Sequence, residues 1–205
     1  MRLTLPNLLS VLRIGLVPLF IIAVLDARPG TALVLMLVAG VTDALDGLAA
    51  RYLHQQSLLG SYLDPIADKL LLASAYVVLA IPGIHAGVTI PVWVTVLVLS
   101  RDVIILGLAL VLSLTFGRQR FPPSWISKLN TTAQIVAVIL VLISGLWPLL
   151  AGVATWSLMA VAVLTILSGL QYAQRMARIT GGGGASPEAE PASLEPGAGP
   201  GSPKG

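Results

Sequence analysis

Residues 41–72 read VTDALDGLAARYLHQQSLLGSYLDPIADKLLL and place four aspartates, Asp43, Asp46, Asp64 and Asp68, within 26 residues of a very apolar chain. Segments apolar enough to cross a bilayer lie on both sides of this stretch. An unpaired aspartate near the centre of a spanning helix costs roughly 2.5–3.5 kcal/mol. Four such residues therefore require compensation. A divalent cation is the simplest compensator, because hard cations prefer carboxylate oxygens.

The composition indicates an integral membrane protein. Of the 205 residues, 56% are hydrophobic and only 10% are charged, against about 25% charged in soluble domains. A soluble fold could not bury so much apolar surface. The chain contains no cysteine, which excludes disulfides and thiolate metal sites. Its two histidines, His54 and His85, are too scattered for a histidine metal site.

Hydrophobic runs separated by breakers predict an all-α, polytopic membrane protein with six transmembrane helices of roughly 20 residues each. We place the six spans at residues 7–26, 31–52, 62–82, 89–115, 124–146 and 149–173. Residues 1–178 would form one domain of six transmembrane helices. In residues 181–205, 13 of 25 are Gly or Pro, so residues 179–205 are predicted to be a disordered cytoplasmic tail.

Basic residues predict the orientation. Residues 1–180 carry 11 Lys or Arg against 6 Asp. Ordinary topogenic charge accounts for most of this excess, which also suits anionic headgroups or phosphorylated substrates. With the N-terminus inside, the outer loops hold only Arg28. Both termini and the aspartate cluster, at the ends of the second and third spans, are therefore predicted to be cytoplasmic. We expect no nucleic-acid partner.

The aspartates have helical spacing. Asp43 and Asp46 are three residues apart and Asp64 and Asp68 four apart, so each pair shares a helix face. Two antiparallel helices joined by a short loop would bring the faces together. Four carboxylates could then hold one or two divalent cations and leave room for substrate oxygens.

Small and basic residues extend these faces. Gly47 and Ala50 would allow close approach of a substrate, and Arg51 could grip a phosphate. Taken alone, Asp64 before Pro65 could merely cap a helix, and Gly60 could be an ordinary loop glycine. Neither alternative explains Asp43 and Asp46 in apolar surroundings.

Together these residues form the pattern D-x2-D-G-x2-A-R-x8-G-x3-D-x3-D, made by Asp43, Asp46, Gly47, Ala50, Arg51, Gly60, Asp64 and Asp68. It resembles the signature of the CDP-alcohol phosphotransferase family of membrane enzymes. Eight fixed positions match by chance on the order of 10⁻¹⁰ per starting point. The resemblance implies the six-helix fold of that family, usually homodimeric, with a polar cavity open to the cytoplasm.

The resemblance also implies the activity and the site. Family members transfer a substituted phosphate from a CDP-linked donor to an alcohol and release CMP. The cofactor would be Mg²⁺ or Mn²⁺, one or two ions, held by Asp43, Asp46, Asp64 and Asp68. Asp68 would also be the general base on the acceptor hydroxyl. The CDP site would comprise Asp43, Asp46, Gly47, Ala50, Arg51, Gly60 and Asp64, with Arg51 meeting the diphosphate.

Similarity beyond the signature narrows the choice of acceptor alcohol. The opening LPNLLSVLRIGLVP, residues 5–18, resembles phosphatidylglycerophosphate synthases and eukaryotic-type cardiolipin synthases, and implies that Asn7 and Arg13 frame the cytoplasmic cavity. A helix cap is an equally good interpretation of Asn7.

Further along the chain, Arg101 lies in an apolar span and should face the cavity. We expect it not to pair with its neighbour Asp102, because adjacent helical residues point in different directions. A structural partner on another helix is the alternative role for either residue.

WISKLNTTAQ, residues 125–134, resembles a phosphatidylglycerophosphate synthase pattern with two lysines, of which Lys128 keeps the first while Asn130 replaces the second. Glycerol-3-phosphate carries nearly two negative charges and suits two cations, whereas the phosphodiester of phosphatidylglycerol carries one. The Ser-Lys-x-Asn-Thr form is also similar to cardiolipin synthases. The acceptor site would comprise Arg101, Lys128, Asn130 and Thr131. CDP-diacylglycerol is the expected donor and phosphatidylglycerol the favoured acceptor, with glycerol-3-phosphate as the alternative.

A small cation-coupled transporter is a rival interpretation from another class, because transporters also use intramembrane carboxylates. It gives no reason for Gly60 or for the Gly-x2-Ala-Arg spacing after Asp46. A structural membrane subunit is weaker still, since uncompensated aspartates would only destabilise it.

Overall fold

The structure is a computed structural model, and it describes residues 5–53, 58–85, 87–116 and 125–181. Within these ranges, side chains are described for residues 11–43, 69–85, 87–107, 125–172 and 174. The described residues form helices and no strand: α1 (Leu5–Leu25), α2 (Pro29–Leu53), α3 (Leu58–Leu79), α4 (Val92–Phe116), α5 (Trp125–Ser144), the short 3-10 helix η1 (Pro148–Leu150) and α6 (Ala151–Gly181).

Six long helices therefore match the six predicted segments, with ends shifted by a few residues except at α6. That helix continues to Gly181, past the predicted end of its span at 173 and of the six-helix domain at 178. Residues 182–205, most of the predicted tail, lie outside the described residues.

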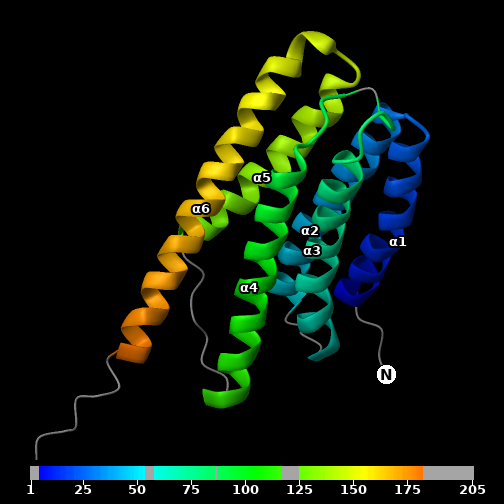
Figure 1. Cartoon of the computed structure of the whole chain (residues 1–205). Helices are drawn as coiled ribbons and strands as arrows, with labels where there is room; N and C mark the ends of the chain where they lie inside the picture. The colour runs from blue at the N-terminus through cyan, green and yellow to red at the C-terminus, as the bar shows by residue number, and fades with distance from the viewer. Residues whose placement is uncertain (1–4, 54–57, 86, 117–124, 182–205) are drawn as a thin grey trace, which may run out of the picture.

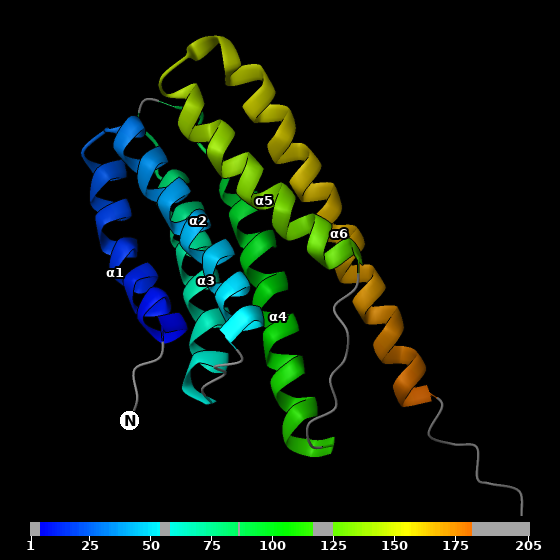
Figure 2. The ribbon, with the colours of Figure 1, turned by 180° about the vertical axis from the view of Figure 1, so that it is seen from behind.

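The helices run alternately up and down in two groups of three (Figures 1 and 2). α1 packs against α2 and α3, and α6 packs against α5 and α4. The groups meet where α5 contacts α2 and α3, whereas α3 touches α4 only over a short stretch. The start of α1 and the end of α6 lie at the same end of the bundle (Figure 1). The end of α2 and the start of α3 also lie there (Figure 2).

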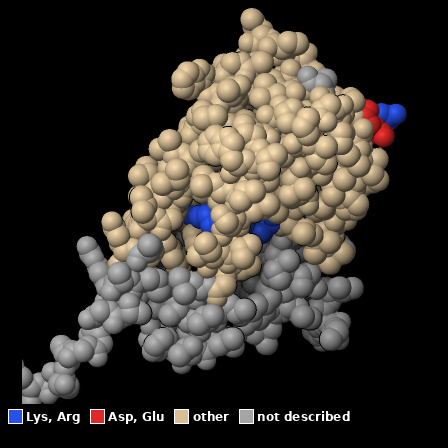
Figure 3. All heavy atoms as spheres, viewed as in Figure 1, with Lys and Arg blue, Asp and Glu red and all other residues tan. Residues whose placement is uncertain are grey.

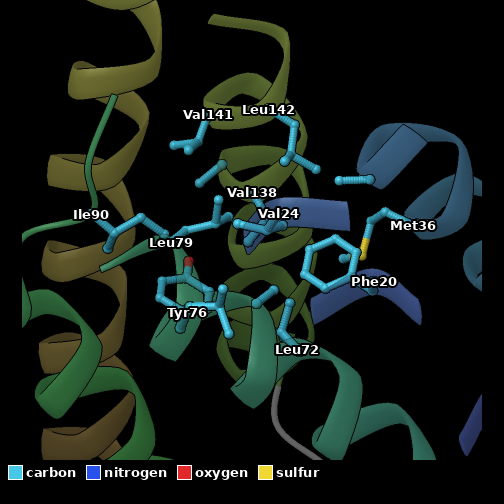
Figure 4. Packing of buried hydrophobic residues seen from close by; sticks show 14 of the residues in the cluster. Phe20, Val24, Met36, Leu72, Tyr76, Leu79, Ile90, Val138, Val141 and Leu142 are labelled. Carbon is cyan, nitrogen blue, oxygen red and sulfur yellow. The ribbon is translucent and has the colours of Figure 1, made fainter. Parts of the chain in front are cut away.

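The core lies between the two groups. Figure 4 shows Phe20 of α1, Met36 of α2, Leu72 of α3 and Val138 of α5 among the buried side chains that converge there. Phe20 and Val138 are fully buried. This packing fixes α1, α2, α3 and α5 relative to one another. Two of these helices, α2 and α3, carry the signature aspartates.

The outer surface is apolar. Large hydrophobic side chains are exposed on every long helix that has described side chains, among them Ile22, Val34, Val77, Ile104 and Val163. So many exposed apolar side chains suit lipid and not water. By length and composition, two helical segments within the described residues could cross a membrane, Trp125–Ser144 and Pro148–Tyr172. Three shorter apolar stretches accompany them, Val11–Leu25, Pro29–Asp43 and Lys69–Leu79.

The four tryptophans are all exposed, and they gather near helix ends. Trp93, Trp147 and Trp156 lie near the start of α4, the α5–α6 turn and the start of α6, which share one end of the bundle. Trp125 is the first residue of α5, at the opposite end of that helix from the α5–α6 turn. Tryptophan is enriched at both membrane–water interfaces, so this distribution fits two interfacial levels.

Candidate active site

The signature residues lie on two consecutive helices. Asp43, Asp46, Gly47, Ala50 and Arg51 are in the last turns of α2. Gly60, Asp64 and Asp68 are in the first turns of α3. Because α3 already begins at Leu58, Asp64 is inside the helix, and its interpretation as a mere helix cap is wrong. Among these residues the side chain of Asp43 is described, and the other seven side chains lie outside the described ones.

Asp43 is held by a cation from α1. Its Oδ1 lies 2.9 Å from Nη1 of Arg13, whose side chain is only 1% exposed, while that of Asp43 is 54% exposed. An arginine buried this deeply in an apolar bundle needs an anionic or hydrogen-bonding partner. The ion pair therefore orients one carboxylate oxygen toward α1 and leaves the rest of the group accessible. Arg13 also lines a cavity between the helices, whereas the side chain of Asn7 lies outside the described ones.

A cavity of about 250 Å³ opens beside this ion pair. Its wall contains two charged residues and is otherwise apolar, and it is made by Arg13, Met36, Ala39, Gly40, Asp43, Leu71, Leu72 and Ile135. Gly40 faces open space, since a Cβ built on it would meet no atom within 4 Å. A site with one charged end and an apolar wall suits an amphiphilic ligand.

Arg101 is the centre of a second polar cluster. Its Nη1 lies 2.7 Å from Oδ1 of Asp102, and its Nη2 donates to the hydroxyls of Ser127 (2.8 Å) and Ser168 (2.7 Å). Our expectation that Arg101 and Asp102 could not pair is wrong. The Cβ atoms of adjacent residues diverge, but the long arginine side chain bends back to the neighbouring carboxylate. The partners on other helices, Ser127 on α5 and Ser168 on α6, were the alternative we left open.

The other predicted acceptor residues lie on the first turns of α5. Lys128 is exposed, with its Nζ 5.8 Å from the ring centroid of Trp125. Thr131 is half-buried and donates to the carbonyl of Ser127. Asn130 is fully buried, and its Oδ1 accepts a hydrogen bond of 3.1 Å from Thr165 of α6. Lys128 and Asn130 therefore stand in different environments, one at the surface and one between two helices.

Two buried N–H groups near this cluster lack an acceptor among the described residues, Nε of Arg101 and Nδ2 of Asn130. An unsatisfied buried donor is costly, so such groups usually meet water or a ligand. Both belong to residues predicted to contact the acceptor phosphate, and both would suit an anionic oxygen.

Sequence reasoning missed the partners of these residues. Ser127 and Asn130 on α5 face Ser168 and Thr165 on α6, as the Asn130–Thr165 hydrogen bond and the Arg101-bridged serines show, and Gln134 is buried one turn farther along α5. The sequence does contain a pattern that indicates such partners: polar side chains spaced three and four residues apart in otherwise apolar helices. We call these five residues the α5–α6 polar seam.

Charged side chains are rare on the visible surface. On the face shown in Figure 3, the described part of the chain shows basic side chains in two recesses near the lower edge. An acidic and a basic group also appear at the upper right, where the turn from α1 to α2 lies (Figures 1 and 3). Among the described residues, no group of three or more His, Cys, Asp or Glu side chains could hold a metal ion. Three of the four predicted metal ligands have side chains outside that search.

Comparison with known proteins identifies the family. The profile of the CDP-alcohol phosphatidyltransferase family matches residues 3–167, which include both signature helices, Arg101 and the start of α5. This chain belongs to the CDP-alcohol phosphatidyltransferase family.

The relatives carry three different names. The chain is 36% identical over 185 residues to a probable phosphatidylglycerophosphate synthase of Mycobacterium tuberculosis, covering 87% of this chain and 84% of the relative. It is 35% identical over 176 residues to the CDP-diacylglycerol–glycerol-3-phosphate 3-phosphatidyltransferase of Escherichia coli, covering 84% and 94%. It is 37% identical over 151 residues to the CMP-forming cardiolipin synthase of Rattus norvegicus, covering 66% and 48%.

Proposed function

We propose that the protein transfers a phosphatidyl group from CDP-diacylglycerol to a glycerol-type hydroxyl and releases CMP. The observation that carries the proposal is the complete eight-residue signature on α2 and α3 within the region matched by the family. The cavity beside Asp43 supports it, because a charged end and an apolar wall fit a lipid with a phosphorylated head.

The reaction is a displacement at phosphorus. Asp68 removes the proton of the acceptor hydroxyl, and the hydroxyl oxygen forms a bond to the phosphorus that carries diacylglycerol. The bond from this phosphorus to the oxygen of CMP breaks, and CMP leaves with the electron pair. Arg51 meets the diphosphate, and Arg13 keeps Asp43 oriented toward the reacting group.

We propose Mg²⁺ or Mn²⁺, one or two ions, as cofactor. Asp43, Asp46, Asp64 and Asp68 would hold it, since carboxylate oxygens are the donors that both ions prefer. The exposed face of the Asp43 carboxylate suits such a ligand, because only one of its oxygens is committed to Arg13. When bound, the metal supplies charge stabilisation at the diphosphate and the departing CMP.

Phosphatidylglycerol is the acceptor we favour, which would make the enzyme a cardiolipin synthase. The supporting observation is that position 130, the second cation of the two-lysine pattern, is an uncharged Asn buried against Thr165. A single-charge phosphodiester needs fewer cations than a phosphomonoester. Glycerol-3-phosphate is the second candidate, and it is favoured by the two bacterial relatives that align over 84% and 94% of their own length.

One assay tests both levels of the proposal. Purified protein in mixed micelles with CDP-diacylglycerol and Mg²⁺ or Mn²⁺ is given phosphatidylglycerol or glycerol-3-phosphate, and CMP release is measured. We expect CMP release with phosphatidylglycerol and formation of cardiolipin. CMP release only with glycerol-3-phosphate would show that phosphatidylglycerol is not the acceptor. No release with either acceptor would contradict the proposed enzymatic activity and would favour the alternative function, a cation-coupled transporter.

We also propose that all six long helices span the bacterial inner membrane, with the active site and both termini cytoplasmic. The apolar exterior and the two levels of exposed tryptophan support this arrangement. A homodimer is the proposed assembly, by resemblance to the family.

Replacing Lys128 tests the acceptor site. Lys128→Gln should raise the KM for phosphatidylglycerol about fivefold, the size expected from one exposed charge pair, and leave the KM for CDP-diacylglycerol unchanged. Lys128 is exposed, so the variant should fold normally. Arg28→Gln, an exposed cation at the opposite end of the bundle, is the control and should change neither KM. Equal changes in both KM values would contradict an acceptor-specific role.

Filling the cavity tests the donor site. Gly40→Leu should raise the KM for CDP-diacylglycerol about 5- to 150-fold, because the leucine would occupy space that the bound lipid needs, and crowding of this kind costs about 1–3 kcal/mol. The side chain has room to be built, since Gly40 faces open space. Gly152→Leu, at an equally open and exposed glycine near the start of α6, is the matched control. If both variants keep the wild-type KM, the cavity does not receive the donor lipid.

A further inference from the structure

One carboxylate joins α3 to the other half of the bundle. Asp102 of α4 accepts from Lys69 of α3 through Oδ2 at 2.7 Å and from Arg101 through Oδ1 at 2.7 Å. Arg101 in turn donates to Ser127 of α5 and Ser168 of α6. Through Asp102, a side chain on α3 is therefore tied to three helices of the other group.

The place of this link on α3 matters. Lys69 directly follows Asp68, the last residue of the signature. α3 packs mainly on α1 and touches α4 only over a short stretch. Among the described residues, the other side-chain hydrogen bond between α3 and α4 runs from Thr95 to the carbonyl of Tyr76, about two turns farther along α3. Of these two described hydrogen bonds between α3 and α4, the Lys69–Asp102 bond is thus the nearer to the aspartates.

The surroundings make the link stronger than a surface ion pair. The Asp102 side chain is 14% exposed and that of Arg101 is 7% exposed, so water and salt screen them little. Lys69 is 35% exposed and reaches inward to Asp102. Each oxygen of the carboxylate has its own cation, which restricts rotation of the carboxylate and fixes the position of the Lys69 ammonium group.

We propose that Asp102 and Lys69 are positioning residues, which hold the aspartate-bearing end of α3 in register with the Arg101 and Lys128 region of α4 and α5. This inference rests on the proposed function, in which α3 carries the general base and α4 and α5 carry the acceptor contacts. The general base and the acceptor contacts then lie on different groups of helices. The Lys69–Asp102 bond sets the distance between the base and these contacts.

The kinetic test uses Lys69→Met, which removes the bond to α3 and leaves Arg101 with Asp102, Ser127 and Ser168. A displacement of about 1 Å between reacting groups can lower the rate about 100-fold, so we expect kcat to fall about 10- to 100-fold. Binding of CDP-diacylglycerol, measured separately by equilibrium titration, should stay unchanged. Lys69→Arg keeps the cation and should recover most of the rate. Lys69→Met combined with Asp102→Asn should be no worse than the more impaired single variant.

The structural test does not depend on activity. The natural chain has no cysteine, so pairs of spin labels can be introduced cleanly. Leu70→Cys with Leu106→Cys labels exposed sites on α3 and α4 near the link, and Val77→Cys with Val92→Cys labels exposed sites toward the other end of the same helices. With labelled protein diluted in unlabelled protein, Lys69→Met should broaden or shift the first distance distribution and leave the second unchanged.

Two results would overturn the inference. An unchanged Leu70–Leu106 distance together with a reduced kcat would mean that Lys69 acts on the substrate directly. Additive losses in the double variant would mean that Lys69 and Asp102 act independently. If no acceptor elicits CMP release, the proposed function fails, but the distance measurement still decides whether the bond holds α3 to α4.

Discussion

Asp68→Asn should lower kcat by about 10²- to 10⁴-fold, the range that general-base catalysis typically contributes. Binding of CDP-diacylglycerol should be largely retained, because an asparagine preserves the size of the side chain and Asp43, Asp46 and Asp64 remain. CMP release under saturating donor and acceptor measures the first quantity. Equilibrium titration with CDP-diacylglycerol in the presence of Mg²⁺ or Mn²⁺ measures the second.

The comparison of the two measurements separates the roles of Asp68. Loss of donor binding together with turnover would contradict a dominant role as base and would indicate a residue that mainly ligates metal. Asp26→Asn is the matched control, because Asp26 is exposed at the turn between α1 and α2, at the opposite end of the bundle. That variant should retain both activity and binding.

Arg13→Gln is expected to produce the second large effect. It removes the cation that lies 2.9 Å from Asp43 and should lower kcat/KM about 100-fold, because the carboxylate is no longer oriented at the site. It should also destabilise the protein by about 1–3 kcal/mol, because a buried cation that partners Asp43 is lost. CMP release and thermal unfolding in detergent measure the two effects.

The variant Arg13→Lys distinguishes the effect of orienting Asp43 from the effect of the positive charge alone. Lysine keeps the positive charge but lacks the planar fork of the guanidinium, so we expect the stability to recover more than the activity. Arg28→Gln, at an exposed arginine away from the site, should resemble the wild type in both measurements. Wild-type activity in Arg13→Gln would show that Asp43 needs no support from α1.

The sequence was sufficient to predict six helices and their approximate ends, because each helix is a long apolar run bounded by Gly, Pro or charged residues. It also predicted the positions of the signature on two consecutive helices. The excess length of α6 was missed, since the residues after Tyr172 are polar enough to leave a bilayer yet still form a helix to Gly181. Hydropathy detects a membrane segment and not the end of a helix.

Contacts between helices were much harder to predict. Arg13 and Asp43 are 30 residues apart on different helices, and no local spacing relates them. Lys69 and Asp102 are separated by 33 residues and pose the same difficulty. The prediction that Arg101 and Asp102 would not pair was wrong for another reason. It considered the direction of the Cα–Cβ bonds but not the length of the arginine side chain. Local rules specify helices, while partners depend on packing that one sequence does not display.

In the proposed arrangement, in which α4 spans the membrane, the pairing of Arg101 with its own neighbour also bears on how the chain enters the bilayer. Arg101 and Asp102 are the two ionisable side chains of α4, and they neutralise each other within that helix. A spanning segment with two separated charges is costly to insert, whereas a contacting pair presents no net charge to the lipid. During synthesis α4 emerges before Ser127 and Ser168 exist, and Asp102 is the partner that Arg101 already has at that stage. The serines of α5 and α6 then complete its coordination as the last two helices are added.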